Sequence, residues 1–524
     1  MLQLSIDGFY LSLILVYFFS AVFVAIGLYQ WKHAVVSIHR FHTIRVGWGI
    51  LWRLFCIICL AFSVLLTWTF GRSNTFIAGI LVNDSVDYSN RGWSDAFDEM
   101  NAHIAKSYAF AKWKSIDWDS LNKEFKPQII AAEKAADKAA YYLTLRKYVY
   151  SLPDGHCFLE GDDLGQINSA IGGGFGFAVI QLDDGRVIAY IVEKTGPADQ
   201  KGMAWGAEIL SWNGQPILMA LDHVSTLWSP SPLATQEGKH IAKLNFLTRA
   251  PVGTTVSVTF CNPDDATIKD ISLTAVADNM RLYIKDAMMG LSGHKIKDSD
   301  QAVESRILPN GYGYLAIRTE SPSLSDLNPV GTVRKAIADF KAAKVSGVVI
   351  DVRANGGGIE EMTRMMMAHF IMKSLFYKQL AFTDETGRLR HFSDISIEPV
   401  AVNYAGPTAM LISNQTISAG EGFPLVMKSL NRGPVVGFYG TYGSFGEAAG
   451  RIRLPGNYAV IYPNGASLDK DGKIQIDSNN LMQGGISPDV RIPIDMEALK
   501  AICVDHRDYA LEAAIAAMNA APKK

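Results

Sequence analysis

The sequence predicts an α/β core of βαβ type, accompanied by a small β-rich domain, a helical N-terminal segment and two transmembrane helices. Alternating strand and helix patterns after residue 311 indicate the core, and two long apolar runs near the N-terminus indicate the membrane helices. The chain of 524 residues suffices for three or four domains of about 150 residues each. A net charge of -2 argues against a nucleic-acid partner, and five scattered cysteines argue against a disulfide scaffold or a structural zinc site.

Residues 1–72 predict a membrane anchor. The runs 9–30 and 46–70 are each long enough to span a bilayer core of about 30 Å, and Arg53 in the second run can snorkel to the interface. Basic residues in the short connector place it in the cytoplasm and residues 73–524 outside. In a bacterium this means the inner membrane, with the C-terminal portion in the periplasm and the lipid bilayer as a partner. A cleaved signal peptide is the alternative, but no basic residue precedes the first run.

Residues 73–165 predict a helical segment that ends in a turn. Apolar positions recur at helical spacing over 94–152, with a break that offers Asp117 as a helix cap. The helical pattern ends at a Pro-Asp-Gly turn, and His156 follows directly. A histidine in this position could act as a general base, although a lone histidine is more often structural.

Two further segments complete the chain. Residues 166–285, here called the β-rich domain, hold short alternating runs of β-branched residues separated by glycines. In residues 286–524, strands and helices alternate from Gly311 onward, which is typical of βαβ units and a largely parallel sheet.

Two turns in the core could carry chemistry. The apolar strand AMLIS runs into a turn where Ser418 would lie at the carboxyl end of a strand and at a helix N-terminus, whose N–H groups can stabilise an oxyanion. The spacing from Ser418 to Glu421 also fits a capping box, and spacing alone favours that interpretation. The second turn, Arg353 to Gly358, has three glycines that let backbone approach a ligand, and an ordinary flexible turn explains it equally well.

Together these pieces resemble the C-terminal processing (tail-specific) serine peptidases and the related tricorn-type core, over roughly residues 95–524. The β-rich domain is similar to a PDZ domain. The matching pieces stand in the family's order: L-x-D-G-H at 152–156, Gly174-Phe175-Gly176-Phe177, G-Y-x-x-I at 313–317, D-x-R-x-N-G-G-G at 351–358, the serine turn, a turn at 437–446, and G-I-S-P-D at 485–489.

The resemblance implies roles for several residues. Ser418 would be the nucleophile, and the N–H groups of Ala419 and of Gly356 or Gly357 would form the oxyanion hole. One branch of the family uses a lysine in a T-x-G-K-G turn, but Ser444 occupies that position here.

A different base is therefore expected. The tricorn-like branch uses a Ser–His–acid arrangement, which makes His156 the base. Met482 fills the usual position of the acid, so Asp477 becomes the first candidate for the third residue and Glu447 the second.

The implied function is that of a membrane-anchored serine endopeptidase. The loop Gly174-Phe175-Gly176-Phe177 would hold the carboxylate of a protein or peptide substrate with an accessible C-terminus, and neither a metal nor another cofactor is implied. The missing lysine and glutamate leave one alternative open, a degenerate peptidase that acts as a peptide-binding scaffold. A weaker alternative is binding of a hydrophobic small molecule in the cleft.

Overall fold

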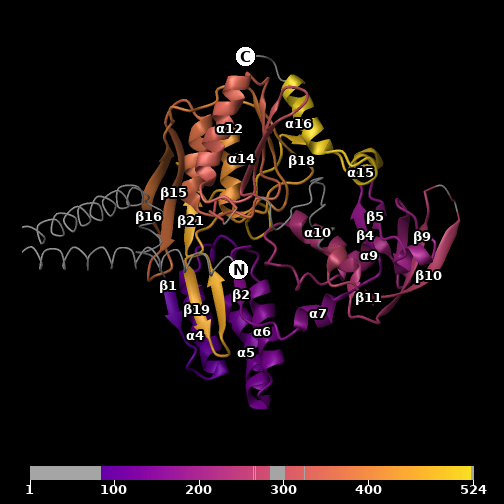
Figure 1. The fold of residues 1–524 in the computed structure, drawn as a ribbon. Coiled ribbons are helices and arrows are strands. Elements are labelled where there is room, and N and C mark those ends of the chain that lie inside the picture. Colours follow the sequence, from indigo (N-terminus) through magenta and orange to yellow (C-terminus); the bar gives the residue numbers. More distant parts are fainter. Residues whose placement is uncertain (1–83, 264, 266, 284–300, 324, 521–524) are drawn as a thin grey trace, which may run out of the picture. The chain divides into compact units, whose positions relative to one another are not determined.

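The computed structural model describes residues 84–263, 265, 267–283, 301–323 and 325–520. All of them lie in one compact unit, Val82–Lys524. The description below follows the chain from the helical segment to the core that holds the serine turn (Figure 1).

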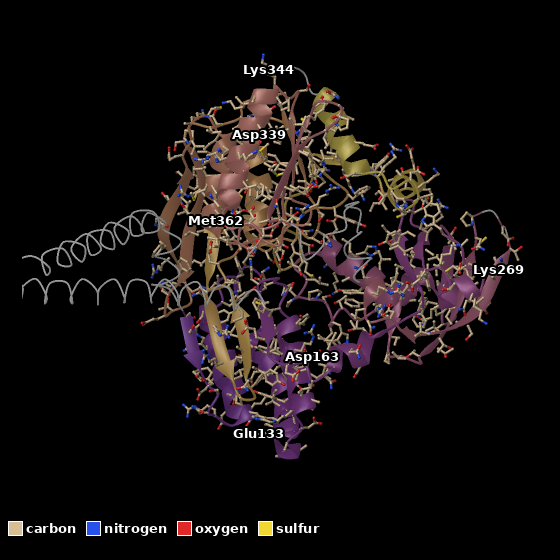
Figure 2. The ribbon with its side chains drawn as sticks, in the orientation of Figure 1. Glu133, Asp163, Lys269, Asp339, Lys344 and Met362 are labelled. Atoms are coloured by element: carbon tan, nitrogen blue, oxygen red, sulfur yellow. The ribbon has the colours of Figure 1, made fainter. Side chains whose placement is uncertain are left out.

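Three helices form the first part. They are α4 (Trp93–Ser107), α5 (Trp118–Ala135) and α6 (Lys138–Tyr150). Asp117 caps α5 as predicted, because its side chain accepts the Ser120 N–H. Glu133, labelled in Figure 2, caps α4 from a distance, since its carboxylate accepts the N–H groups of Trp93 and Ser94.

These helices pack on a sheet built from both ends of the described chain. The strand order is β1 (Asp84–Asp87), β19 (Gly450–Leu454), β20 (Tyr458–Tyr462) and β2 (Phe158–Glu160). Side chains of α4 and α6 share one apolar core with β19 and β20, exemplified by Phe97, Tyr148, Ile452 and Val460. The turn that carries His156 lies between α6 and β2, so this sheet and α6 fix both of its ends.

The β-rich domain contains an antiparallel sheet with a free end strand. Its order is β10 (Ile268–Thr274), β9 (Thr255–Cys261), β6 (Glu208–Trp212), β5 (Val187–Val192) and β4 (Phe177–Gln181), with β7 (Gln215–Pro216) beside β6. Helix α10 (Gln236–Leu247) packs against β4. A smaller sheet joins β11 (Val276–Ala277), β3 (Gly173–Gly174) and β8 (Arg249–Ala250).

The core is a six-stranded sheet that is parallel except at one edge. Its order is β12 (Val303–Ile307), β13 (Gly313–Ile317), β14 (Val348–Asp351), β17 (Thr408–Leu411), β18 (Val435–Gly437) and β22 (Val490–Arg491), and only β12 runs antiparallel to its neighbour. The connecting helices are α12 (Pro329–Ala343), α13 (Glu360–Met367) and α14 (Gly422–Leu430). The carboxyl ends of β14 and β17 are adjacent, which brings the glycine turn next to the serine turn.

The C-terminal helices cover one face of this sheet. Helices α15 (Met496–Cys503) and α16 (Tyr509–Ala520) pack with inward residues of the core sheet and with β4 and β5 of the β-rich domain in one apolar cluster. A three-stranded sheet, β16 (Leu389–Ile397), β15 (Leu375–Thr383) and β21 (Gly465–Leu468), completes the described elements of the core.

The predicted fold class needs correction. Among the described ranges, no helix is both long and apolar enough to cross a bilayer; the longest, α5, has 18 residues and carries several charges. In its described ranges the structure is a mixed α/β fold with several sheets, and the two predicted transmembrane helices find no support there. The predicted inner-membrane location rested on those helices and is corrected with them. The two runs, 9–30 and 46–70, lie outside the described residues.

Candidate active site

Ser418 occupies a strained turn between β17 and α14. It begins a short 3-10 helix, Ser418–Glu421, and its φ of 60° lies in the left-handed region that non-glycine residues rarely adopt. The residue at the N-cap is Ile417, whose side chain makes no capping hydrogen bond, and Ser418 lies inside the helix. The capping-box interpretation, which spacing alone favoured, is therefore wrong.

The side chain of His156 contacts that of Ser418. Its Nε2 lies 2.9 Å from Ser418 Oγ, across 262 residues of sequence. Asp154 fixes the turn, because its carboxylate accepts the His156 N–H and the Tyr108 hydroxyl. A neutral ring with its proton on Nδ1 can accept the serine proton at Nε2. Burial lowers the pKa of His156 below its usual 6.5, against the opposing charges of Asp154 and Glu447, so the neutral form dominates at pH 7.

The glycine turn touches the serine. A Cβ on Gly357 would lie 2.6 Å from Ser418 Cβ, and the φ of Gly357 is 86°. The Gly357 N–H donates to Asn355 Oδ1 at 2.8 Å, and the Gly356 N–H donates to Arg318 O at 3.3 Å. The two glycines predicted for the oxyanion hole thus adjoin Ser418, with their N–H groups engaged inside the protein.

Ala419, the third predicted oxyanion donor, follows Ser418 in the 3-10 helix. A helix leaves its first N–H groups without intrahelical acceptors, so this position suits an anionic oxygen.

Asp477 is buried, and among the described residues its side chain makes no hydrogen bond to the histidine. Its Oδ1 accepts the Phe445 N–H at 3.0 Å, while its Oδ2 has no hydrogen-bond partner in the described part of the chain. Burial raises the pKa of Asp477 well above its usual value, and the nearby charge of Asp154 adds to this. His156 Nδ1 likewise has no partner among the described residues. The role of Asp477 as the third residue therefore stays a prediction.

Glu447, the second candidate acid, is held by a lysine. Lys378 is fully buried, and its Nζ lies 3.0 Å from Glu447 and 3.4 Å from Glu360. No local pattern predicts this cluster, because the two glutamates lie 18 and 69 residues from Lys378 in the chain.

Sequence reasoning assigned Glu421 to a capping box, but most of its hydrogen-bond partners lie in a different turn. It is fully buried, and its carboxylate accepts the Thr441 hydroxyl and the N–H groups of Gly443 and Ser444. Burial raises its pKa to about 7. The three-residue spacing from Ser418 is present as predicted, and the glutamate binds the turn 441–444 in addition to the backbone of Ser418.

The lysine of helix α14, Lys428, is engaged outside the serine turn. Lys428 forms an ion pair with Asp489 of the G-I-S-P-D segment, which directs its ammonium away from Ser418. Another lysine, Lys114, is buried on the far side of the histidine turn and donates to Pro153 O at 2.8 Å and to Ser478 Oγ at 2.9 Å. The break between α4 and α5, where Lys114 lies, gave no sign of this role.

The predicted carboxylate-binding loop leads directly into β4, the strand at the end of its sheet. The rings of Phe175 and Phe177 are buried against Trp212, and Gly176 has a φ of 81°. A Cβ on Gly176 would lie 2.8 Å from Pro197 Cδ, so the loop has room only for glycine at this position.

Comparisons with known proteins point to one family. Residues 311–492 match the model of peptidase family S41. The carboxy-terminal processing protease CtpB of Bacillus subtilis (strain 168) is 25% identical over 305 residues, covering 56% of this chain and 53% of the relative. The chain thus spans about half the length of this curated relative.

Solved structures share the fold. The crystal structure of mature CPAF has a TM-score of 0.60 at 15% identity and covers 82% of this chain and 98% of its own. The structure of mature CPAF complexed with lactacystin has a TM-score of 0.57 at 15% identity, covering 82% and 99%.

Proposed function

We propose that the protein cleaves polypeptides through a serine acyl-enzyme, with Ser418 as nucleophile and His156 as general base. The match of residues 311–492 to the model of peptidase family S41 supports a serine-type peptidase. The observation that supports it best is the 2.9 Å approach of His156 Nε2 to Ser418 Oγ, made by a strained serine at a helix N-terminus. A serine hydroxyl is a weak nucleophile alone, and an adjacent imidazole supplies the base that it needs.

The reaction proceeds in two halves. His156 takes the proton as Ser418 Oγ attacks the scissile carbonyl, and it then delivers this proton to the leaving amine. Water, activated by the same imidazole, releases the acyl group. The Ala419 N–H stabilises the oxyanion, and the Gly357 N–H joins it once the carbonyl oxygen replaces Asn355 Oδ1 as acceptor.

The substrate class follows from the end strand of the β-rich domain. Strand β4 lies at the end of its sheet, with α10 beside it and the glycine-containing loop at its start. An extended peptide can pair with such a strand, and loop N–H groups can hold its terminal carboxylate. We therefore propose proteins or peptides with accessible C-termini as substrates.

A serine-directed fluorophosphonate probe tests the catalytic part of the proposal. It should label wild-type protein at Ser418, and neither Ser418→Ala nor His156→Ala should be labelled at a comparable rate. On a peptide substrate each variant should lose at least about 10³-fold in kcat, and the double variant should be little worse, because members of one catalytic unit are non-additive. The value of kcat/KM should fall as the pH drops through the lowered pKa of His156, so its acidic limb should lie below pH 6.5.

Lys428→Ala is the matched control, since its ion pair with Asp489 lies outside the proposed site. It should keep most turnover. A folded His156→Ala protein with near wild-type turnover would refute the proposed base. A wild-type protein that binds peptide but is never labelled at Ser418 would instead identify a peptide-binding scaffold.

A further inference from the structure

Ser444 links the two halves of the proposed catalytic pair. It is fully buried, and its hydroxyl accepts the Gly155 N–H at 2.9 Å, one residue before His156. Its carbonyl accepts the Ser418 N–H at 3.0 Å. One residue thus contacts both the serine turn and the histidine turn, which are 262 residues apart.

The turn 441–444 is itself held firmly. Ser444 N–H donates to Glu421 Oε2 at 2.9 Å, and Gly443 N–H donates to Glu421 Oε1 at the same distance. Glu421 ends the short helix that Ser418 begins, so Ser444 is tied to the serine by two separate contacts. The side-chain hydroxyl is therefore the part of Ser444 that reaches toward the histidine.

We propose that Ser444 is a positioning residue whose hydroxyl, through Gly155, sets the place of His156 relative to Ser418. This inference rests on the proposed function. The resemblance implies a lysine base at this position in one branch of the family, whereas Ser444 in this chain contacts the histidine turn.

The physical basis is the burial of the Gly155 N–H. A Cβ on Gly155 would lie 2.5 Å from Tyr442 Cε1 and 2.9 Å from Ile417 Cδ1, so the backbone is closely packed there. Without the Ser444 hydroxyl, the buried Gly155 N–H loses its acceptor among the described residues. The turn must then move for this N–H to find another partner. A shift of about 1 Å in a catalytic group can lower a rate about 100-fold.

The experiment compares Ser444→Ala with Ser467→Ala. Ser467 is equally buried, and its hydroxyl also makes one hydrogen bond to the backbone, as the donor to Phe445 O at 3.1 Å. Both variants lose one buried serine hydroxyl, so both should melt at similarly reduced temperatures. Only Ser444→Ala should lose about 10- to 100-fold in kcat and in the rate of fluorophosphonate labelling, with KM little changed. Ser444→Thr, which keeps the hydroxyl, should recover most of the loss.

A double variant shows whether the effect passes through the histidine. In a His156→Ala background, Ser444→Ala should cause no further loss in the labelling rate. A further loss there, or equal turnover in Ser444→Ala and Ser467→Ala, would overturn the inference while leaving the proposed function intact. A wild-type protein that is never labelled would remove the proposed function, and this inference with it. If Ser444→Ala does not fold, Ser444→Cys, which keeps the volume with a weaker acceptor, carries the same comparisons.

Discussion

The left-handed backbone conformation of Ser418 is unfavourable in free energy. A left-handed conformation at a non-glycine residue is worth about 1–3 kcal/mol of strain, and surrounding contacts must impose it. Here the Ser418 N–H is held by Ser444 O, and the preceding Ile417 N–H is held by Asn355 O. The result is that Oγ faces His156 rather than the N–H groups of its own helix.

Glu320 offers a test of burial at the scale of one residue. It is fully buried, its Oε1 accepts Asn355 Nδ2 at 2.7 Å, and burial raises its pKa to about 8. A carboxyl whose pKa is higher in the folded state stabilises the fold at low pH, and this contribution is lost as the pH rises toward 8. Glu320→Gln should therefore flatten the fall of the melting temperature between pH 5 and pH 9.

The difference between wild type and Glu320→Gln should change by at most roughly 1.4 kcal/mol per pH unit across that window. Thermal melts at several pH values measure it, with the exposed Glu385→Gln as control. Parallel curves for wild type and Glu320→Gln would show that the buried carboxyl does not titrate in this range.

At this scale, sequence reasoning named the two residues whose side chains the structure brings together, Ser418 and His156, but it did not find the residues that hold them in place. The bonds of Glu421 and Ser444 join segments about 20 to 290 residues apart, and no local spacing encodes them. A three-residue spacing is shared by a capping box and by this arrangement, so only the fold separates the two.

At the scale of elements, the sequence predicted the core closely from Gly311 onward. The expected alternation of strands and helices appears there as β13, α12, β14 and α13, and the predicted strand AMLIS overlaps β17, Thr408–Leu411, in its first part. Buried parallel strands are almost continuously apolar, which makes them visible in a sequence.

Other elements gave weaker signals. The hairpin of β15 and β16 mixes polar and apolar residues with two register shifts, which blurs the alternation of a strand. The break between α5 and α6 rests on a left-handed Ala136, a residue that ordinarily favours helix, so it could not be foreseen.

The glycine turn after β14 should tolerate substitution at one position and not at its neighbour. Gly357→Ala places a methyl group 2.6 Å from Ser418 Cβ in a left-handed backbone, whereas a Cβ on Gly356 meets nothing within 4 Å. We expect Gly357→Ala to lose about 100-fold or more in kcat, because the serine must move.

Gly356→Ala should lose far less, and the two variants should be compared by kcat and by fluorophosphonate labelling. Circular dichroism checks that both are folded. Equal losses would show that the close approach to Ser418 does not govern activity.

At the scale of the whole molecule, distant segments are joined in single sheets. Strand β1 pairs with β19, from Asp84 against Gly450, and β2 pairs with β20. Such pairings depend on partners about 300 or more residues away, so local patterns did not predict this sheet. The division into domains drawn from the sequence stays a prediction.

Capture and cleavage are assigned to different sheets, which separates their effects in experiment. Gly176→Ala would crowd Pro197 in the proposed carboxylate loop, while Gly185→Ala in the same domain imposes a similar backbone strain in open space. We expect Gly176→Ala to raise KM about 10-fold for peptides with a free C-terminus and much less for amidated ones. Gly185→Ala should change KM equally for the free and the amidated peptides.

Initial-rate measurements on one peptide in its free and amidated forms decide the matter. Equal losses on both forms in Gly176→Ala would remove the idea of carboxylate capture. The melting temperatures of the two variants show whether their folds are equally affected.

The spacing of the serine and its histidine has a consequence for synthesis. A ribosome adding about 5–20 residues per second needs roughly 10 to 50 s to pass from one to the other, and it must then continue to the turn that joins them. During that interval the emerging chain holds the proposed base without the proposed nucleophile. A nascent chain of this kind therefore lacks the proposed catalytic pair until at least 418 of its 524 residues have been made.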